Sequence, residues 1–360
     1  MSSVPDGRDV VRTRTEADRL DRPPLLVLDA LAAFLDENHI GAGDLDVTPI
    51  GEGQSNVTFA VRRGDTRVVV RRGPRPPLPR STHDMAREAR VQQFVAGHGI
   101  PVPRILAVCT DESVLGVPFY VMEYLDGLVV TDDIPDVLSA PAARQSTGWA
   151  LVDLLVRLHR VPVDSPAAQA LGRPVGYLSR QVERFGALWG GNTTRDLPVV
   201  GRLGTWLAST LPDSQAAAVV HGDYRMGNVM FAPDGTVRAL LDWEMATVGD
   251  PLADLGYLVA TYAEPGRPSS VMELTSATRQ PGYPSRGELV QRYAEGSSLD
   301  LAALPWYETL ALWKAAIFCE AIHTRWLNGE RPDDTRFAPA LTAGVPRLLE
   351  LAEASAARLP

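Results

Sequence analysis

Residues 219–231 read VVHGDYRMGNVMF, in which a polar loop separates two short apolar runs. A third apolar run, residues 237–241, follows a Pro-Asp-Gly turn and ends at Asp242. A turn of this composition between two short apolar segments predicts a β-hairpin. The loop before the hairpin therefore presents Asp223 and Asn228, and the end of the hairpin presents Asp242.

These three side chains have the chemistry of a phosphoryl-transfer site. Mg²⁺ prefers hard oxygen ligands and usually takes one or two carboxylates together with substrate phosphates. Asn228 and Asp242 offer such oxygens, and we predict that both bind the metal. Asp223 is then left to accept a proton from a hydroxyl group, as the catalytic base does in the H-x-D-x-x-x-x-N loop of protein kinases. Each residue alone is also a common turn former, so the prediction depends on the spacing of the whole set.

The same residues carry a resemblance to a known family. The segment HGDYRMGN at residues 221–228, followed by Asp-Trp-Glu at residues 242–244, resembles the aminoglycoside phosphotransferase and choline kinase superfamily of small-molecule kinases. The run GDPLADL at residues 249–255 resembles the branch whose phosphotransferase domain is attached to some acyl-CoA dehydrogenases. The resemblance covers roughly residues 47–329. It implies an α+β, protein-kinase-like fold of two lobes: an N-terminal antiparallel five-stranded sheet with one main helix, and a larger, mainly helical C-terminal lobe.

On this interpretation the sequence divides into three parts. Residues 1–24 are polar, carry mixed charges and end in two prolines, and we expect a flexible tail. Residues 25–126 form the β-rich, nucleotide-binding N-lobe, and residues 127–360 form the C-lobe with the catalytic loop and the acceptor site. Within the C-lobe, residues 264–286 are rich in Pro, Gly and Ser, which favours a flexible loop near the acceptor.

A strand-loop-strand near the start of the N-lobe carries the candidate phosphate-binding glycines. The loop GEGQSN, residues 51–56, lies between two predicted strands. In kinases a glycine-containing loop of this kind covers the nucleotide phosphates. We therefore assign nucleotide contacts to the backbone of its glycines and to two polar side chains: Gly51, Gly53, Ser55 and Asn56. An ordinary hairpin turn is the alternative.

The next strand, residues 67–72, departs from the kinase pattern. Where a kinase has a phosphate-contacting lysine, this strand has Arg71, and Arg72 follows it. Side chains alternate along a strand, so Arg71 shares a face with Val69 while Arg72 points to the opposite face. We predict that Val69 contacts the adenine, that Arg71 contacts phosphate, and that Glu88 on the following helix pairs with Arg71. The alternatives are a solvated arginine at the end of the strand and a surface ion pair for Glu88 within its own helix.

The segment FYVMEYLDG, residues 119–127, resembles the strand and hinge that hold the adenine in kinases. The resemblance implies that the backbone C=O of Glu123 and the backbone N–H of Leu125 meet the base. Met122 precedes them and is assigned to the same nucleotide site.

Three polar residues of the C-lobe are predicted to be structural. His159 ends a predicted helix, where a cation is favourable. Asp250 precedes a proline at the start of another helix, a pattern typical of an N-cap. The resemblance implies that either Asp250 or Asp254 braces the catalytic loop.

Composition excludes several other classes of protein. A chain of 360 residues with 45% apolar and 22% charged residues is typical of a globular protein. Its net charge of −9 argues against binding of nucleic acid, which needs basic surfaces. Two cysteines far apart in sequence predict neither a disulfide framework nor a metal site. With no signal sequence and no apolar run of membrane-spanning length, we expect a cytoplasmic protein that does not contact membranes.

These observations predict an ATP- and Mg²⁺-dependent kinase that transfers the γ-phosphoryl group to a hydroxyl of a small metabolite or natural product. Two alternatives stay open: an aminoglycoside or other antibiotic O-phosphotransferase, and a nucleotide-binding pseudokinase without transfer activity. A polycationic aminoglycoside favours a pocket with Asp and Glu, an anionic acceptor such as a hydroxyacyl thioester favours Arg, and a neutral natural product favours aromatic walls. Five basic residues of the C-lobe argue against an aminoglycoside: Arg180, Arg184, Lys314, His323 and Arg325. The sequence predicts neither the acceptor itself nor the oligomeric state.

Overall fold

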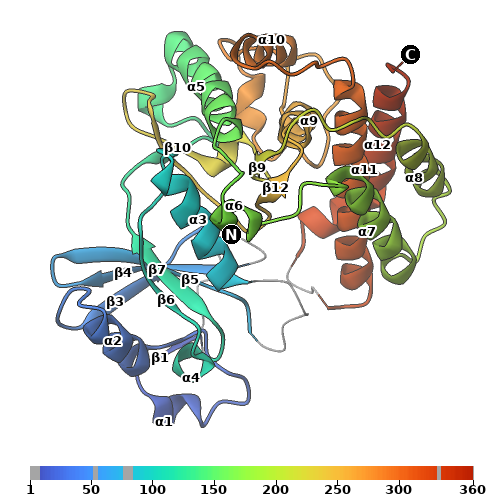
Figure 1. Cartoon of the computed structure of the whole chain (residues 1–360). Helices are drawn as coiled ribbons and strands as arrows, with labels where there is room; N and C mark the ends of the chain where they lie inside the picture. Colours follow the sequence, from blue (N-terminus) through green and yellow to red (C-terminus); the bar gives the residue numbers. More distant parts are fainter. Residues whose placement is uncertain (1–8, 52–55, 76–83, 331–333, 360) are drawn as a thin grey trace. The chain divides into compact units, whose positions relative to one another are not determined.

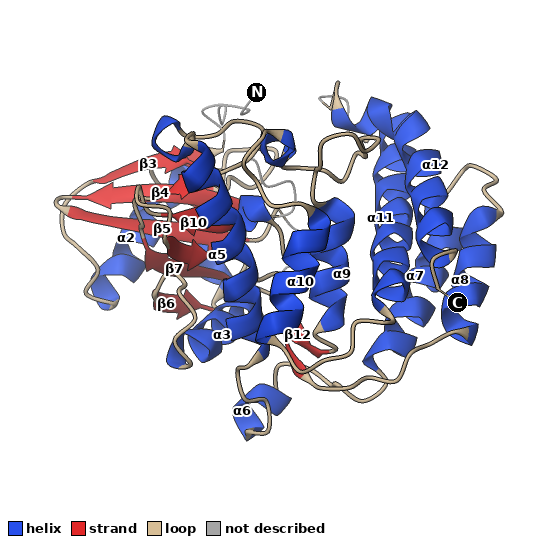
Figure 2. Cartoon of the chain, turned by 90° about the horizontal axis from the view of Figure 1, so that it is seen from above, coloured by secondary structure: helices blue, strands red, loops and turns tan. Residues whose placement is uncertain are grey.

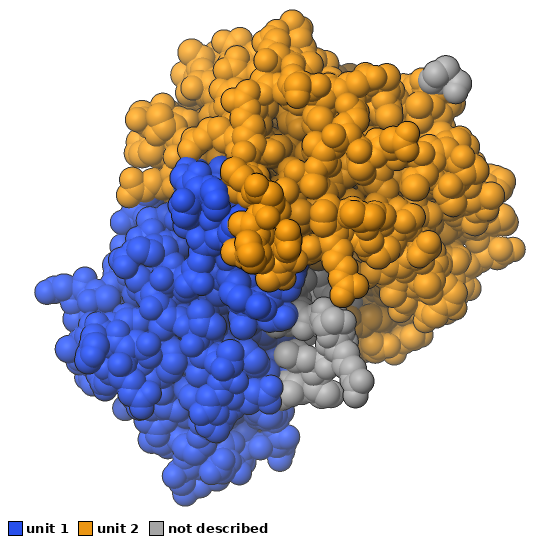
Figure 3. Space-filling model, viewed as in Figure 1, with its two compact units in different colours: residues 1–126 blue, residues 127–360 orange. Residues whose placement is uncertain are grey.

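The computed structural model of the chain describes residues 9–51, 56–75, 84–330 and 334–359. The chain divides into two compact units, unit 1 before Gly127 and unit 2 from Gly127 onward, which are coloured separately in Figure 3. The division falls where the sequence analysis places the end of the N-lobe. Strands are concentrated in unit 1 and helices in unit 2 (Figure 2), so the predicted α+β class is confirmed.

An antiparallel sheet of five strands forms the centre of unit 1 (Figure 1): β3 (Leu45–Pro49), β4 (Val57–Arg63), β5 (Thr66–Arg72), β6 (Ile105–Cys109) and β7 (Phe119–Glu123). Their order in the sheet is β3-β4-β5-β7-β6. The central strand β5 is rich in valine, since β-branched side chains pack well on a pleated surface. A tight turn at Gly64, whose φ is +57°, joins it to β4. The five strands expected from the sequence are therefore present.

Three helices cover the two faces of this sheet: α2 (Leu28–Glu37), α3 (Met85–Gly97) and α4 (Glu112–Leu115). On one face, α2 and α4 contribute to the larger apolar core, which contains Phe59 and Val70. On the other face, α3 packs Ala89 against Tyr120. Because side chains alternate along a strand, neighbouring residues of β5 belong to different faces, and this places Arg71 on the α3 face.

Residues 9–24 contain two short regular elements within the segment for which a flexible tail was predicted, and residues 1–8 lie outside the described residues. The segment contains β1 (Val10–Val11) and α1 (Arg14–Ala17), and β1 pairs in parallel with β2 (Leu26–Val27). A capping box between Thr13 and Glu16 begins α1. The buried guanidinium of Arg72 donates to the backbone carbonyl of Leu25. The segment is thus held by a helix cap and by an arginine that is distant in sequence. Neither contact can be inferred from the spacing of apolar residues.

Helices make up most of unit 2: α5 (Pro141–His159), α6 (Pro166–Gln169), α7 (Tyr177–Asn192), α8 (Val199–Ser209), α9 (Leu252–Thr261), α10 (Arg286–Gly296), α11 (Leu304–Leu327) and α12 (Phe337–Ala356), with the 3-10 helices η1 (Asp136–Leu138), η2 (Met226–Asn228) and η3 (Ser276–Arg279). α11 is buried on almost every side and packs against α7, α8, α9 and α12. A helix that is apolar all round belongs in a core. Among the described residues, none of the helices combines the length and the hydropathy needed to span a membrane.

Two small sheets lie among these helices: β8 (Leu128–Val129), β10 (Val229–Phe231) and β11 (Val237–Leu240) form one, and β9 (Ala218–Val220) and β12 (Thr247–Gly249) form the other. β10 and β11 are the hairpin predicted from the sequence. Gly127 lies just before β8, where a Cβ would overlap the side chain of Met230, so a glycine suits this close approach. Two short loops connect the two small sheets, one after β9 and one after β11.

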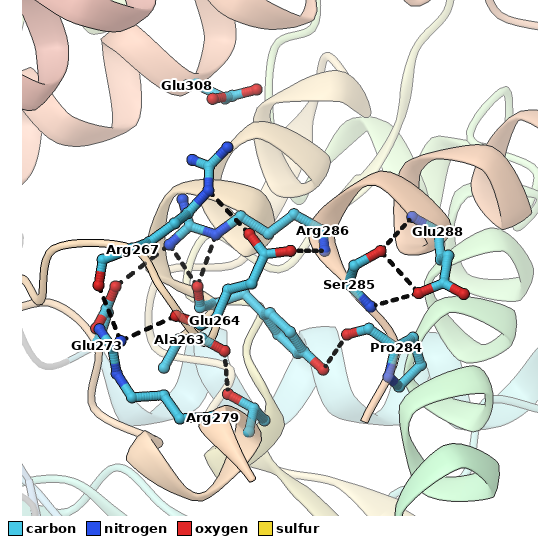
Figure 4. Close-up of polar contacts among 12 residues, drawn as sticks. Ala263, Glu264, Arg267, Glu273, Arg279, Pro284, Ser285, Arg286, Glu288 and Glu308 are labelled. Atoms are coloured by element: carbon cyan, nitrogen blue, oxygen red, sulfur yellow. Dashed lines mark hydrogen bonds and ion pairs between the residues drawn. The ribbon is translucent and has the colours of Figure 1, made fainter. Parts of the chain in front are cut away.

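Residues 264–286 are not the flexible loop that we expected. Arg279 and Arg286 both pair with the carboxylate of Glu273, which is 3% exposed (Figure 4). Arg279 also donates to the backbone carbonyl of Glu264 at 2.9 Å. Charge-assisted hydrogen bonds of this kind are stronger than neutral ones. They fix a segment whose Pro, Gly and Ser content offers little apolar surface.

Candidate active site

Two loops connect the small sheets of unit 2 and carry the predicted catalytic residues. One runs from β9 to β10 and contains Asp223 and Asn228, and the other runs from β11 to β12 and contains Asp242. The backbone N–H of Leu241 donates to the backbone C=O of Asn228 at 2.8 Å, so the loops touch immediately beside Asp242. The structure thus brings together the three residues that the sequence spacing singled out.

The first loop is braced by Asp254 on α9. Its two carboxylate oxygens accept hydrogen bonds from the backbone N–H of His221 at 2.6 Å and of Gly222 at 2.8 Å. The ring of His159 lies 3.4 Å from the same carboxylate, in the structural role predicted for it. The N-cap position of α9 is held by Pro251, one residue after the predicted Asp250, whose carboxylate accepts from the backbone N–H of Leu252 at 3.0 Å. Of the two candidates for the brace, the structure therefore selects Asp254.

The buried ring of His221 links the two loops. Its Nε2 donates to the backbone carbonyl of Leu241 at 2.9 Å, and its Nδ1 accepts from the backbone N–H of Asp223 at 3.3 Å. These partners assign the proton to Nε2. The next residue, Gly222, has a φ of +85°, and a Cβ there would lie 2.8 Å from the backbone of Met245. A histidine followed by a glycine is therefore required by the geometry of this loop.

The carboxylate of Asp223 is held at both oxygens. Asn228 Nδ2 donates to Oδ2 at 2.8 Å, and the hydroxyl of Tyr257 donates to Oδ1. Arg225 Nε lies 3.5 Å from Oδ2. Because a carboxylate only accepts, the amide of Asn228 must turn its nitrogen toward Asp223. That orientation leaves Oδ1 of Asn228 as its atom for a cation.

Asp242 has a φ of +64°, a left-handed conformation that is uncommon outside glycine. Such backbone strain persists only where the surrounding structure enforces it, and it is concentrated at functional sites. With Asn228 Oδ1, the Asp242 carboxylate gives a donor set of one carboxylate and one amide oxygen. This set is too small for an all-protein metal site, but it fits Mg²⁺, which completes its shell with phosphates and water.

In unit 1, Arg71 and Glu88 form an ion pair. Arg71 Nε lies 2.9 Å from Glu88 Oε1, with the two side chains 13% and 2% exposed. The hydroxyl of Tyr120 donates to the same oxygen at 3.0 Å. Arg72 points to the other face of the sheet, where it is fully buried. The predicted pairing of Arg71, rather than Arg72, with Glu88 is present in the structure.

The residues assigned to the adenine lie on the two neighbouring strands β5 and β7. Val69 is directly opposite Met122 in the register of these strands and is buried. Glu123 ends β7, and its carboxylate accepts from the backbone N–H of Arg104 at 2.9 Å. Leu125 follows β7 in the segment that leads to unit 2. Their contacts with a nucleotide remain a prediction.

The candidate phosphate loop is described at its two ends. Gly51 is exposed and has a φ of +81°, a conformation that favours glycine. Asn56 is buried at the start of β4. The remaining two assigned residues, Gly53 and Ser55, lie outside the described residues.

Four of the five basic residues weighed for the acceptor make contacts within the protein. Arg180 donates to two backbone carbonyls before α7, and Arg325 pairs with Glu330 at 3.0 Å. His323 Nε2 lies 3.1 Å from the hydroxyl of Thr342. Lys314 Nζ donates to a glutamine of α7 at 2.9 Å. These contacts do not favour one class of acceptor over another.

Sequence reasoning missed three contacts with the site, those of Tyr257, of Arg225 and of the ring of His221. Tyr257 lies three residues after Asp254, which places both on one face of α9. The spacing of three residues indicates that Tyr257 lies near whatever Asp254 contacts. Nothing local in the sequence shows that this face of the helix meets the catalytic loop. The ring of His221 follows from the motif only once the second loop is known to pass beside it.

Comparisons with known proteins agree with this geometry. The family model of the phosphotransferase enzyme family matches residues 46–289. Acyl-CoA dehydrogenase family member 11 of Homo sapiens is 32% identical over 318 residues, which are 86% of this chain and 40% of the relative. The chain thus spans about two fifths of the length of this curated relative.

Solved structures show the same fold. A candidate aminoglycoside phosphotransferase from Ralstonia eutropha has 28% identity and a TM-score of 0.74, over 92% of this chain and 98% of that chain. A thermostable mutant of an aminoglycoside phosphotransferase, solved with AMP-PNP and hygromycin B, has 16% identity and a TM-score of 0.59, over 89% of this chain and 98% of that chain. The predicted two-lobe, protein-kinase-like fold is confirmed. With a family match over most of its length and the predicted acyl-CoA dehydrogenase relatives, the chain belongs to the phosphotransferase enzyme family.

Proposed function

We propose that this protein is a small-molecule kinase that transfers the γ-phosphoryl group of ATP to a hydroxyl group. One observation carries the proposal: the carboxylate of Asp223 is fixed by Asn228 in a loop that touches the loop of Asp242. Family membership supports phosphoryl transfer. The relative solved with AMP-PNP and hygromycin B is a complex with an ATP analogue, which supports ATP as the donor.

In the proposed reaction, the hydroxyl oxygen of the acceptor attacks the γ-phosphorus of ATP. The bond between this phosphorus and the β,γ-bridging oxygen breaks, and ADP leaves with the electron pair. Asp223 orients the attacking hydroxyl and takes its proton. Because the transition state of phosphoryl transfer is loose, most of the acceleration comes from positioning and from neutralisation of charge. A carboxylate held at both oxygens is suited to the positioning role.

The nucleotide contacts come from unit 1 in this proposal. Arg71, held by Glu88, steadies the phosphates in place of the usual lysine, and its guanidinium can contact two phosphate oxygens at once. In unit 2, Asn228 and Asp242 would hold Mg²⁺. When bound, the metal neutralises negative charge on the phosphates.

Release of ADP in the presence of a panel of alcohols tests the proposal. The panel contains one acceptor of each chemical class: kanamycin as a polycation, glycerol as a neutral alcohol and a hydroxyacyl thioester of coenzyme A as an anion. We expect ADP release that depends on one class of acceptor and on Mg²⁺, and that is lost in the variant Asp223→Asn. If the protein binds ATP but forms no ADP, either with any of these acceptors or with water as the acceptor, the result would favour a pseudokinase.

The metal assignment has a separate test. Asp242→Ala should weaken binding of ATP in the presence of Mg²⁺, while binding of ATP with EDTA should change little. Calorimetric titration of both proteins measures this directly. Equal dependence on Mg²⁺ in the variant and the wild type would remove Asp242 from the role of ligand.

A further inference from the structure

Helix α9 contacts the catalytic loop at two levels. Asp254 accepts hydrogen bonds from the backbone of His221 and Gly222, and one turn later Tyr257 donates its hydroxyl to Oδ1 of Asp223. Residues three apart lie on the same face of a helix. One face of α9 therefore holds both the backbone of the loop and the side chain of its central aspartate.

The position of α9 is itself fixed by close packing against α11. A Cβ at Gly256 would lie 2.6 Å from the Cβ of Tyr307 and 2.7 Å from its backbone carbon. Real Cβ atoms essentially never lie within 3.0 Å of such neighbours, so the two helices approach each other more closely than any residue other than glycine would allow at this position. Tyr257, the next residue, is therefore placed by a rigid element rather than by a loop.

Tyr257 and Asn228 donate to different oxygens of Asp223. Tyr257 donates to Oδ1, and Asn228 donates to Oδ2 at 2.8 Å. Two donors on opposite oxygens fix the rotation of the carboxylate about its Cβ–Cγ bond. A carboxylate has about four lone-pair positions. Oδ2 also has Arg225 Nε at 3.5 Å, whereas Oδ1, which accepts from Tyr257, retains capacity for one more hydrogen. Burial, and secondarily the charge of Asp223, raise the pKa of Tyr257 well above its usual value, so the phenol stays a donor.

We propose that Tyr257 is a positioning residue for phosphoryl transfer: its hydroxyl fixes the plane of the Asp223 carboxylate so that a remaining lone pair faces the acceptor hydroxyl. The inference rests on the proposed kinase function. Tyr257 does not itself take the proton, because its hydroxyl hydrogen is committed to Asp223. Its contribution lies in the orientation of the base, and small displacements of a reacting group can cost about 100-fold in rate.

The test is a double-mutant cycle between Tyr257→Phe and Asp223→Asn. The probe is Mg·ATP with the panel compound that the wild type phosphorylates fastest, or with water if none is phosphorylated. Tyr257→Phe keeps the ring and removes the hydroxyl, and we expect kcat to fall about 10- to 100-fold while the KM for ATP changes less than about twofold. In the background of Asp223→Asn the same substitution should change kcat less than about twofold, because the carboxylate that it orients is gone.

Tyr307→Phe is the matched control. Tyr307 also donates its hydroxyl to an aspartate, Asp250, at 2.9 Å, but that carboxylate accepts from the first backbone N–H of α9 and from no residue of the catalytic loop in our assignment. We expect this variant to lose about 1 kcal/mol of stability and to keep kcat. Thermal unfolding of the wild type and of every variant shows whether any loss of rate comes from partial unfolding.

Each outcome decides between the possibilities. A loss of kcat on Tyr257→Phe that disappears in the background of Asp223→Asn supports the proposal. An equal loss in both backgrounds, a loss matched by Tyr307→Phe, or an unchanged kcat overturns it while the kinase function stands. A wild-type protein that releases no ADP with any compound or with water overturns both the kinase function and the role of Tyr257.

Discussion

The two units hold their candidate functional residues in different ways. In unit 1, Arg71 projects from a strand and meets Glu88 on the helix that covers the same face, with one further hydrogen bond from Tyr120. In unit 2, Asp223 sits in a loop whose backbone and side chain are both held by α9. The first site is held by side chains that meet where one helix covers the sheet, and the second is held by several bonds from an element about thirty residues away in sequence.

This difference predicts different responses to substitution. In unit 1 a related cation can replace part of the interaction that Arg71 makes, because a point charge keeps some of the attraction. A loop held by several buried hydrogen bonds has no such reserve, because each lost partner leaves a buried donor unsatisfied. We therefore expect graded losses in unit 1 and steep losses in unit 2.

The largest effect should come from Asp223→Asn. The amide keeps the size of the side chain but cannot take a proton from the acceptor, and general-base and positioning roles are typically worth about 10²- to 10⁴-fold in rate. We expect kcat to fall by that amount while binding of Mg·ATP is retained. Steady-state kinetics and calorimetry measure the two effects. Near wild-type turnover would remove Asp223 from the role of base.

Asp254→Asn should have the next largest effect. An amide offers one acceptor oxygen to the two backbone N–H groups of His221 and Gly222, and it points an NH₂ group at the other. We expect the free energy of unfolding to fall by about 2–3 kcal/mol and kcat to fall at least about 10-fold. Glu88→Gln is the matched change in unit 1, where an amide oxygen can still face Arg71. Equal losses of stability in the two variants would contradict the contrast between the units.

The same contrast decides what could be predicted from the sequence. Arg71 was placed correctly on the face of Glu88 because strand alternation is local and strictly periodic. The roles of Asp254 and Tyr257 depend on which face of α9 meets a loop far away in sequence, and no local pattern reports that contact. The N-terminal segment differs from the prediction for a related reason, since the carbonyls of residues 24 and 25 accept from Arg72, which is distant from them in sequence.

Arg71→Ala tests the proposed phosphate contact. We expect the KM for ATP to rise about 10-fold and kcat to fall, because loss of a charge-assisted contact costs about 1.5–3 kcal/mol. Arg71→Lys should retain part of the activity, since a point charge keeps some attraction without the fork geometry. Kinetics at varied ATP measure both. An unchanged KM for ATP in Arg71→Ala would show that residues other than Arg71 contact the phosphates.

Arg72→Ala separates the two neighbouring arginines. Arg72 donates to the backbone carbonyls of Leu25 and Gly73, and burial lowers its pKa to about 10. We expect the variant to keep the wild-type KM and kcat but to lose about 1–3 kcal/mol of stability, since buried carbonyls lose their donor. Chemical denaturation measures the loss. A raised KM for ATP would instead reverse the assignment of the two arginines.

The smallest effect on stability concerns Lys314, the single lysine of the sequence. Like Arg72 in unit 1, it is a basic residue whose pKa is lowered by burial. Its Nζ donates to Gln181 at 2.9 Å and lies 4.6 Å from the ring centre of Phe185. Burial, and secondarily the charge of Arg184, lower its pKa from 10.5 to about 8. The protonated form is therefore disfavoured in the folded state relative to the unfolded chain.

The sign of the pH dependence follows from that shift. Below pH 8 both states carry the proton, and the folded state bears the cost of the buried charge. Between about pH 8 and 10.5 the folded state has released the proton while the unfolded chain still binds it, so the free energy of unfolding rises with pH. Because the side chain keeps some exposure, we expect a gain of only about 1–2 kcal/mol. The variant Lys314→Met should lack this gain. Subtracting its free energy of unfolding from that of the wild type at each pH cancels the titration of every other group. A difference that stays flat from about pH 7 to about pH 11 would show that the ammonium of Lys314 remains solvated in the folded protein.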